Sequence, residues 1–308
     1  MSMEAEAGDA PRHGGSWAPG KVAEMLGVSP VTLRTWNARY GAGPTLRADG
    51  RHRRYSDADV RRLRHMQRLI ERGMRAREAA AAVFSGAGET TRREAVPGLV
   101  AELTRAAGAL HFGSLAALLD EALLDMGAAA TWTEVLAPIL REFGRRWQCG
   151  DVCFASEWAL TSETSLALER HSVRFADPAP GRVVLLACCP GERHTLPMEV
   201  LRAALAERGV PAVFLGPMAS PETIAAMAST LDPRPALLWS TSPATVDDPL
   251  RQRLAHQGVT VEPAGSGWGH LADRGLTGVD TLTGALDLVA AHQETPRTGN
   301  RCTIAPNT

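Results

Sequence analysis

One break in the sequence, the Asp-Pro-Ala-Pro-Gly segment at 177–181, divides two kinds of hydrophobic pattern. Before it, apolar side chains recur at the spacing of amphipathic helices, as at Leu115, Leu118 and Leu119. After it, short apolar runs alternate with helical stretches, which indicates a parallel sheet covered on both faces. We therefore predict an α plus α/β multidomain protein. The predicted strands lie at 183–188, 213–215, 236–239 and 259–261, and the predicted helices of this half lie at 196–208, 221–231 and 282–291.

The hydrophobic pattern and the composition also divide the whole chain into domains. Four helices with short connections predict a four-helix bundle over 92–176, and the α/β domain follows over 181–293. A glycine- and threonine-rich stretch at 85–91 indicates a linker between the bundle and an N-terminal block at 17–88. The polar ends, 1–16 and 294–308, are predicted to be disordered tails.

Bulk composition excludes several classes of protein. No apolar run approaches the roughly 18 residues that cross a bilayer, and the first 15 residues lack the apolar segment of a signal peptide. Five cysteines, one of them in the polar C-terminal tail, do not form a disulfide framework. We expect a cytoplasmic protein without membrane contact.

Charge is distributed unevenly along the chain. Residues 17–80 carry 14 Lys and Arg against 6 Asp and Glu, a net charge of +8. The remainder carries 19 basic against 28 acidic residues, a net charge of −9. A compact basic block on an acidic chain indicates a polyanionic partner, although an arginine-rich surface can also be a general feature of composition.

The basic block has the order of elements that a reader of double-stranded DNA needs. Ser29 and Pro30 favour the start of a helix over 30–40, after a short helix and a turn. A basic hairpin with an Asp-Gly turn follows at 45–55, and Ser56 begins another helix. Trp36 is predicted to pack inside this winged helix-turn-helix. The candidates for DNA contact are Thr32, Arg34, Arg39, Tyr40, Arg51, His52, Arg53, Arg54 and Tyr55.

Two stretches carry a specific resemblance. They read Val-Ser-Pro-x-Thr-Leu-Arg-x-Trp-x-x-Arg-Tyr-Gly at 28–41 and Arg-x-Asp-Gly-x-His-Arg-x-Tyr-Ser-x-x-Asp-Val at 47–60. This pattern resembles the MerR family of transcriptional regulators. The resemblance implies a winged DNA-binding domain, and MerR proteins usually carry an effector domain behind it.

The first predicted strand of the α/β half is followed by Cys-Cys-Pro-Gly-Glu-Arg-His at 188–194. In an open α/β sheet, ligands bind beyond the carboxyl ends of the strands. Glu192 lies two residues before His194, and a carboxylate so placed can orient a metal-binding imidazole. A hydroxyl-rich Ser-Thr-Ser stretch follows the third strand, and Gly265 and Gly267 follow the fourth.

These features resemble base-off, His-on cobalamin domains, in which the histidine is the lower cobalt ligand. With the preceding bundle, the chain is similar to the light-responsive, cobalamin-dependent CarH/LitR branch of the MerR family. The resemblance implies a flavodoxin-like (Rossmann-like) sheet, adenosylcobalamin as the form bound, and a homodimer or tetramer. It makes His194 the metal ligand. The implied cofactor-binding residues are Trp147, Glu157, Glu192, His194, Ser240, Ser242, Gly265 and Gly267.

Three positions depart from this branch. The family glycine after the histidine is Pro197 here. The two bundle histidines are replaced by Gln148 and Trp158, although Trp147 and Glu157 are kept. In the family the first bundle histidine replaces the photolysed adenosyl group, and glutamine offers cobalt no imidazole. A photoreceptor-like switch locked by that ligand is therefore not expected.

We thus predict a transcriptional regulator that senses cobalamin, with light as a further signal, through a change of oligomeric state. An alternative is a MerR-type regulator whose cobalamin fold is vestigial and which acts without ligand, through a partner protein or through a cysteine-based signal. The cysteine pairs 149/153 and 188/189 motivate the last of these. An enzyme is not expected, because the winged domain and the absence of a substrate barrel argue against a corrinoid carrier or mutase.

Overall fold

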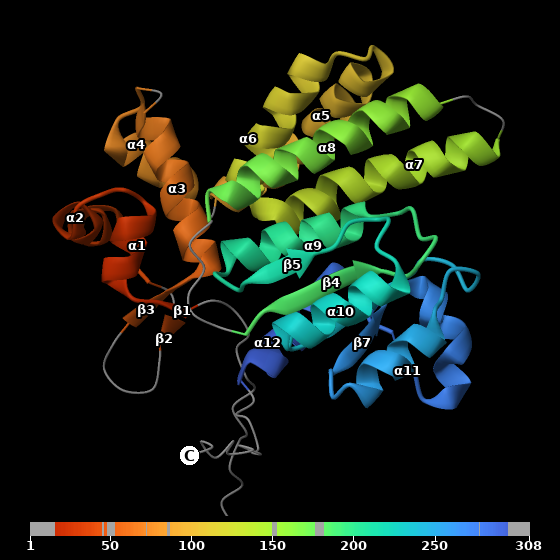
Figure 1. Cartoon of the computed structure of the whole chain (residues 1–308). Coiled ribbons are helices and arrows are strands. Elements are labelled where there is room, and N and C mark those ends of the chain that lie inside the picture. The colour runs from red at the N-terminus through yellow and green to blue at the C-terminus, as the bar shows by residue number, and fades with distance from the viewer. Residues whose placement is uncertain are drawn as a thin grey trace, which may run out of the picture.

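The computed structural model describes residues 16–44, 46–47, 53–71, 73–84, 87–149, 153–175, 182–276 and 278–294. Figure 1 shows three parts, with the N-terminal helices beside one end of a helical bundle and an α/β domain beneath that bundle. The predicted tails lie almost wholly outside the described residues.

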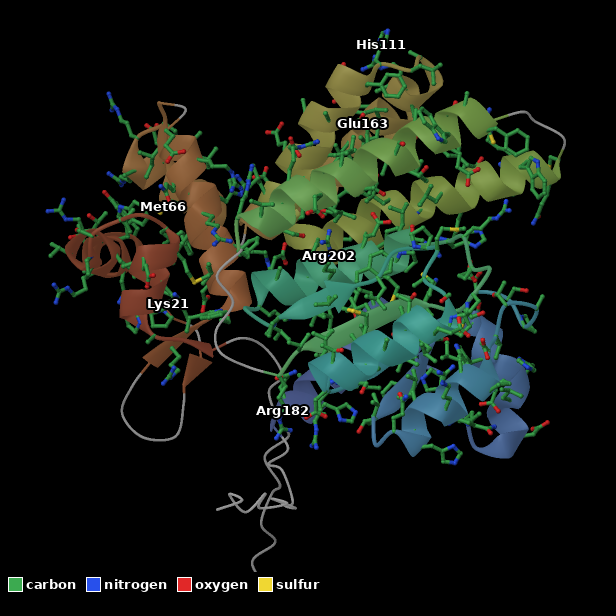
Figure 2. The ribbon with its side chains drawn as sticks, viewed as in Figure 1. Lys21, Met66, His111, Glu163, Arg182 and Arg202 are labelled. Carbon is green, nitrogen blue, oxygen red and sulfur yellow. The ribbon has the colours of Figure 1, made fainter. Side chains whose placement is uncertain are left out.

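The N-terminal part is a small winged domain. Its elements are β1 (Ser16–Trp17), α1 (Pro19–Met25), α2 (Pro30–Tyr40), β2 (Leu46–Arg47), β3 (Arg53–Ser56), α3 (Asp57–Glu71) and α4 (Ala76–Phe84). The strands form an antiparallel sheet in the order β1-β3-β2. Its core includes Leu33, Leu63 and Met66, all fully buried, and Met66 is labelled in Figure 2. Trp17 pairs with Tyr55 in this sheet, so the first helix begins only at Pro19.

The second part is the predicted bundle. Its elements are α5 (Ala87–Gly108), α6 (Phe112–Ala130), the π-helix η1 (Thr131–Leu136), α7 (Ala137–Gln148) and α8 (Phe154–Val173). Helix α5 already begins at Ala87, so most of the predicted linker at 85–91 is helical. Gly127 interrupts α6 with φ 79° and ψ 165°. Residues other than glycine rarely adopt this backbone conformation.

One helical stretch of the described residues, Phe112–Gln148, is long enough to cross a membrane and contains an 18-residue window with a mean hydropathy of 1.2. Its side chains Leu115, Leu119 and Leu123 are buried in the core that the bundle shares with α9. We therefore assign the stretch to the interior of the bundle, where an apolar helix is also expected.

The third part is a parallel α/β domain. Its elements are β4 (Val184–Cys188), α9 (Leu196–Glu207), β5 (Ala212–Phe214), α10 (Pro221–Leu231), β6 (Ala236–Trp239), α11 (Asp248–His256), β7 (Val261–Ala264), the 3-10 helix η2 (Ser266–Arg274) and α12 (Leu282–Glu294). The fourth strand starts two residues later than predicted, and the prediction did not include α11. The sheet order β5-β4-β6-β7 is that of a flavodoxin-like fold.

The sheet order positions the ligand site. Val184, Leu186 and Cys188 of β4 face the core shared with α9 and the bundle, while Leu185 and Ala187 face α10 and α11. The chain leaves β4 toward β5 on one side and continues from β6 toward β7 on the other. The connections after β4 and β6 thus run to opposite sides of the sheet, and open α/β sheets bind ligands at the carboxyl edge of such a switch point.

Candidate DNA interface and ligand site

Helix α2 is held at both ends by local interactions. The Ser29 hydroxyl accepts a hydrogen bond from the backbone N–H of Thr32 at 3.0 Å, and Pro30 occupies the first helical position. Gly41 ends the helix with φ 68°, the left-handed conformation that glycine adopts without strain. Trp36 is 9% exposed and lies in the core of the winged domain, which confirms its predicted packing role.

The outer face of α2 presents cations to solvent. Arg34 and Arg39 are exposed, and neither forms an ion pair within the described part of the chain. Val31 lies one turn before Arg34 on the same face, and its side chain is 61% exposed. The sequence reasoning missed Val31. An apolar side chain beside an arginine can contact a thymine methyl group while the arginine reads a guanine.

The predicted wing residues divide into exposed and buried side chains. Arg54 on β3 is exposed, whereas Tyr55 is only 2% exposed and packs in the core of the winged domain. We therefore remove Tyr55 from the DNA-contact candidates. Successive residues of a strand face opposite sides, so an outward Arg54 requires an inward Tyr55. Burial, and secondarily the charge of Asp59, raises the pKa of the Tyr55 hydroxyl.

Other candidates have intermediate or undescribed positions. Thr32 is half-buried, and its hydroxyl lies 2.9 Å from the Ser29 hydroxyl. Tyr40 is also half-buried. Arg51 and His52 lie outside the described residues, as does the side chain of Arg53, whose backbone belongs to β3.

A reciprocal cap joins the wing to α3. The Ser56 N–H donates to Asp59 Oδ2 at 2.8 Å, and the Asp59 N–H donates to the Ser56 hydroxyl at 3.1 Å. The sequence predicted a helix start at Ser56, and the capping box observed there satisfies two backbone donors at once. The end of β3 and the start of α3 are thereby held in one orientation.

The site at the carboxyl edge of the sheet is organised around a buried carboxylate. Glu192, in the loop after β4, is 2% exposed. Its Oε1 accepts hydrogen bonds from the N–H groups of Arg193 and His194, both at 2.8 Å. Its Oε2 accepts from the Thr241 N–H at 2.7 Å and from the hydroxyls of Thr241 and Thr245 at 2.8 and 3.1 Å. The carboxylate therefore joins the loops after β4 and β6 at the carboxyl edge of the sheet.

These hydrogen bonds decide the charge of Glu192. Burial raises the pKa of its carboxyl, but hydrogen bonds from Thr241 and His194 outweigh burial and lower the pKa from 4.5 to about 2. The group is consequently ionised at neutral pH. An ionised carboxylate only accepts hydrogen bonds, so every donor around it keeps its proton.

One ring nitrogen of His194 is hydrogen bonded within the protein, and the other is not. Its Nδ1 lies 2.7 Å from Glu192 Oε1 and 3.2 Å from the Thr241 hydroxyl. Because the ionised Glu192 only accepts hydrogen bonds, Nδ1 carries a proton, and in the neutral ring the lone pair is then on Nε2. The side chain is 74% exposed, and Nε2 has no protein partner among the described residues. Trp239 steadies the loop by donating its indole N–H to the His194 carbonyl at 2.8 Å.

The serines and glycines that the resemblance names as cofactor-binding make contacts between the loops themselves. The buried Ser240 hydroxyl donates to the Ser242 carbonyl at 2.8 Å. A Cβ atom on Gly265 would lie 2.2 Å from the Ser240 carbonyl oxygen, and one on Gly267 would lie 2.6 Å from the Ser240 hydroxyl. The close approach that requires these glycines is therefore between two loops of the chain itself. Thr241 and Thr245, which sequence reasoning did not single out, are the residues that contact Glu192.

The bundle residues named from the sequence lie on α7 and α8. Trp147 is 56% exposed and makes an edge contact with Phe154, with ring centroids 6.0 Å apart. Trp158 is 62% exposed and meets Phe112 in the same manner at 6.2 Å. Glu157 is half-buried. The ends of these helices thus present large aromatic surface to solvent, which is unusual for a folded domain.

The cysteines form no reactive cluster in the described part of the chain. Cys153, Cys188 and Cys189 are buried, and Cys149 is exposed. Burial raises the pKa of Cys188 to about 12 and that of Cys189 to about 11, and so keeps both as unreactive thiols. Among the described residues, no three His, Cys, Asp or Glu side chains gather as a metal site.

Comparison with known proteins decides the family. The model for the MerR HTH family regulatory protein matches residues 18–83. The HTH-type transcriptional repressor CarH of Myxococcus xanthus is 32% identical over 208 residues, which are 63% of this chain and 69% of the relative. The chain belongs to the MerR family. The repressor CarA of the same organism is 33% identical over 203 residues, covering 63% of this chain and 66% of the relative.

A solved structure is also similar. A cobalamin-binding protein from Desulfitobacterium hafniense DCB-2 is 15% identical, with a TM-score of 0.32, over 63% of this chain and 98% of that chain.

Membership of the MerR family makes this chain a transcriptional regulator with double-stranded DNA as its partner. Its relatives regulate transcription and are not enzymes. The predicted recognition of the family is thereby confirmed, and the exposed arginines of α2 belong to its DNA-binding domain.

Proposed function

We propose that this MerR-family protein senses cobalamin, with His194 as the lower ligand of cobalt. The observation that carries the proposal is the pairing of His194 Nδ1 with the ionised Glu192 at 2.7 Å. This pairing leaves Nε2 available at the carboxyl edge of the sheet, where open α/β sheets bind ligands. A neutral imidazole held by a carboxylate is the donor that a borderline metal ion such as cobalt takes.

The residues named for the cofactor would have different roles around a bound corrin. Trp147 and Glu157 would lie toward the upper face of the corrin, and the exposed indole of Trp147 offers it a flat apolar surface. Ser240, Gly265 and Gly267 would shape the site by holding its loops together, and Ser242 would border the nucleotide tail. Pro197 lies in the first turn of α9, where proline is tolerated. Bound as adenosylcobalamin, the cofactor would supply a light-sensitive cobalt–carbon bond.

The DNA-binding half would act as a symmetric pair. One α2 helix and wing contact a short stretch of duplex, and palindromic sites require two copies related by twofold symmetry. We propose a homodimer or tetramer in the cytoplasm, whose state of association depends on the cofactor. Sedimentation of the full chain in the dark, with and without adenosylcobalamin, tests this. An unchanged sedimentation coefficient would refute the dependence.

Visible absorption of the full chain mixed with adenosylcobalamin tests the ligand site directly. We expect a base-off, His-on spectrum that is lost or sharply weakened in His194→Ala. The matched control is His256→Ala, because His256 is exposed at the end of α11 in the same domain. If the unaltered protein binds no cobalamin, the proposal fails and the vestigial alternative stands. Equal binding by both variants would remove His194 from the ligand set.

Light sensing would be weak in this chain. Gln148 ends α7 and Trp158 projects from α8. These are the two positions that carry histidine in the light-responsive branch of the family, so neither offers an imidazole here. We expect illumination to change the spectrum without adding a protein nitrogen to cobalt. A second-histidine signature in the illuminated, unaltered protein would contradict this placement of the upper face.

A further inference from the structure

A cavity of about 220 Å³ lies where the three parts of the molecule meet. Figure 1 shows this meeting point, where α3 reaches the ends of α6, α8 and α9. The volume far exceeds the ~15 Å³ that one water requires. The lining residues are Met25, Val60, Arg61, Arg64, Leu123, Leu124, Gly127, His171, Arg174, Phe175 and Glu207.

The cavity carries an excess of positive charge. Arg61 and Arg64 reach it from α3 of the winged domain, and Arg174 reaches it from the turn after α8. Glu207 is the only carboxylate among the described lining residues. Its Oε1 already accepts a hydrogen bond from the Ala128 N–H at 2.8 Å and lies 2.7 Å from His171 Nε2. Three guanidinium groups thus share one carboxylate, whose Oε1 is already in contact with Ala128 and His171.

Arg64 is half-buried, which makes this excess of positive charge costly. Its guanidinium lies over the ring of Phe175, 4.8 Å from the ring centroid. Burial lowers the pKa of Arg64; Glu207 raises it, and Arg68, Arg174 and Arg61 lower it further. A buried cation beside like charges is stabilised when an anion enters.

His171 adds an independent sign of a ligand. Its side chain is 6% exposed, and its Nδ1 has no hydrogen-bond partner among the described residues. A buried polar atom without a partner is rare in folded proteins. When Nε2 donates to Glu207, Nδ1 accepts a hydrogen bond from a hydroxyl or a protonated acid oxygen; in the protonated ring it donates one.

We propose that this junction cavity binds a small anion bearing a phosphate or carboxylate group. Arg61, Arg64 and Arg174 would hold the anionic oxygens, because guanidinium groups match phosphate and carboxylate geometry. His171 would hydrogen bond through Nδ1 to a protonated oxygen or hydroxyl of the same ligand. The site is separate from His194 and does not depend on cobalamin.

Occupation of this cavity would couple DNA binding to the rest of the chain. Two of its arginines belong to the winged domain, and Arg174 and His171 belong to the bundle. An anion shared between them would stabilise this arrangement of the winged domain against the bundle. The bound anion would thereby favour one orientation of the winged domain relative to the bundle. An effector that shifts such an equilibrium can change DNA binding from a distance.

Thermal unfolding of the full chain tests the site, with inorganic phosphate and citrate as the two anionic probes. Sodium chloride at matched ionic strength separates specific binding from charge screening. We expect phosphate, citrate or both to raise the Tm above that in chloride in a saturable manner, and the stronger probe identifies the anionic group. An equal Tm in all three salts overturns the proposal.

Two variants locate the binding. Arg174→Gln removes an exposed member of the site, so it should fold, and it should weaken the apparent affinity for the anion about tenfold or more. Arg105→Gln makes the same change of charge on the exposed face of α5, away from the cavity, and should leave the affinity unchanged. Equal affinities in the two variants would show that the anion binds elsewhere and overturn the assignment.

Discussion

Replacement of Glu192 by glutamine tests the organisation of the ligand site. The carboxylate accepts hydrogen bonds from two backbone N–H groups of its own loop and from Thr241 and Thr245 of the loop after β6. Glutamine has nearly the same shape, but its amide group brings two donors to a place that contains only donors. Glu192→Gln should therefore loosen the connection between the two loops and release His194.

The pKa of Glu192 gives the magnitude. Glutamine resembles the protonated carboxyl, and protonation is disfavoured in the folded protein because the pKa falls from 4.5 to about 2. A drop of about 2.5 corresponds to roughly 3 kcal/mol, since each pKa unit is worth about 1.4 kcal/mol. We expect Glu192→Gln to lower the free energy of unfolding of the α/β domain by about 3 kcal/mol at pH 7.

The pH dependence has a definite sign. The folded-state pKa of Glu192 lies below its unfolded value, so its contribution is complete above pH 4.5 and declines as the pH falls toward 2. The stability difference between the unaltered protein and Glu192→Gln should stay constant from pH 7 to about pH 5. It should shrink at lower pH.

Hydrogen exchange of β4 and β6 amides, read by mass spectrometry, reports the opening free energy of this domain alone. The control is Glu262→Gln, which removes a carboxylate 2.9 Å from His292 Nε2 where both side chains are more than a quarter exposed. That change should cost less than about 1 kcal/mol. A cost below about 0.5 kcal/mol for Glu192→Gln, or a difference that does not change with pH, would refute the reasoning.

Four other expectations follow from single residues. Arg34→Ala should weaken binding to the specific operator by about 1–3 kcal/mol in a fluorescence titration, with less effect on random DNA; equal losses on both would limit Arg34 to phosphate contact. Gly127→Ala should cost about 2 kcal/mol or more in urea unfolding, because φ is 79° and the new Cβ would lie 3.0 Å from Arg61 Cδ; a neutral effect would contradict the kink. The exposed Cys149 should react with iodoacetamide far faster than Cys188, whose pKa is about 12; comparable rates would revive a thiol signal. Gln148→His should alter the spectrum of the illuminated, cobalamin-loaded protein, and an unchanged spectrum would place Gln148 away from the corrin.

The local features of this fold could be predicted because their interactions span only a few residues. The Ser29 cap and the Ser56–Asp59 capping box each join residues three apart, so the order of residue types alone specifies them. The alternation of strands and helices after 181 likewise predicted the parallel sheet, with an error of two residues in β7 and without α11. His194 and Glu192 were predicted as a pair because they lie in one loop.

The remaining features depend on contacts between residues distant in sequence. Thr241 reaches Glu192 across 49 positions, and no local pattern selects it over its serine neighbours. Gly265 and Gly267 were named for the cofactor, and only the tertiary structure shows that both also lie close to the Ser240 loop. Tyr55 was predicted to contact DNA, although burial places it in the core. The junction cavity needs α3, α8 and α9 together, so only the folded chain brings its arginines around His171. Sequence determines which groups are present and their local caps, whereas packing over long separations decides which of them meet, because those contacts form only when distant elements share one core.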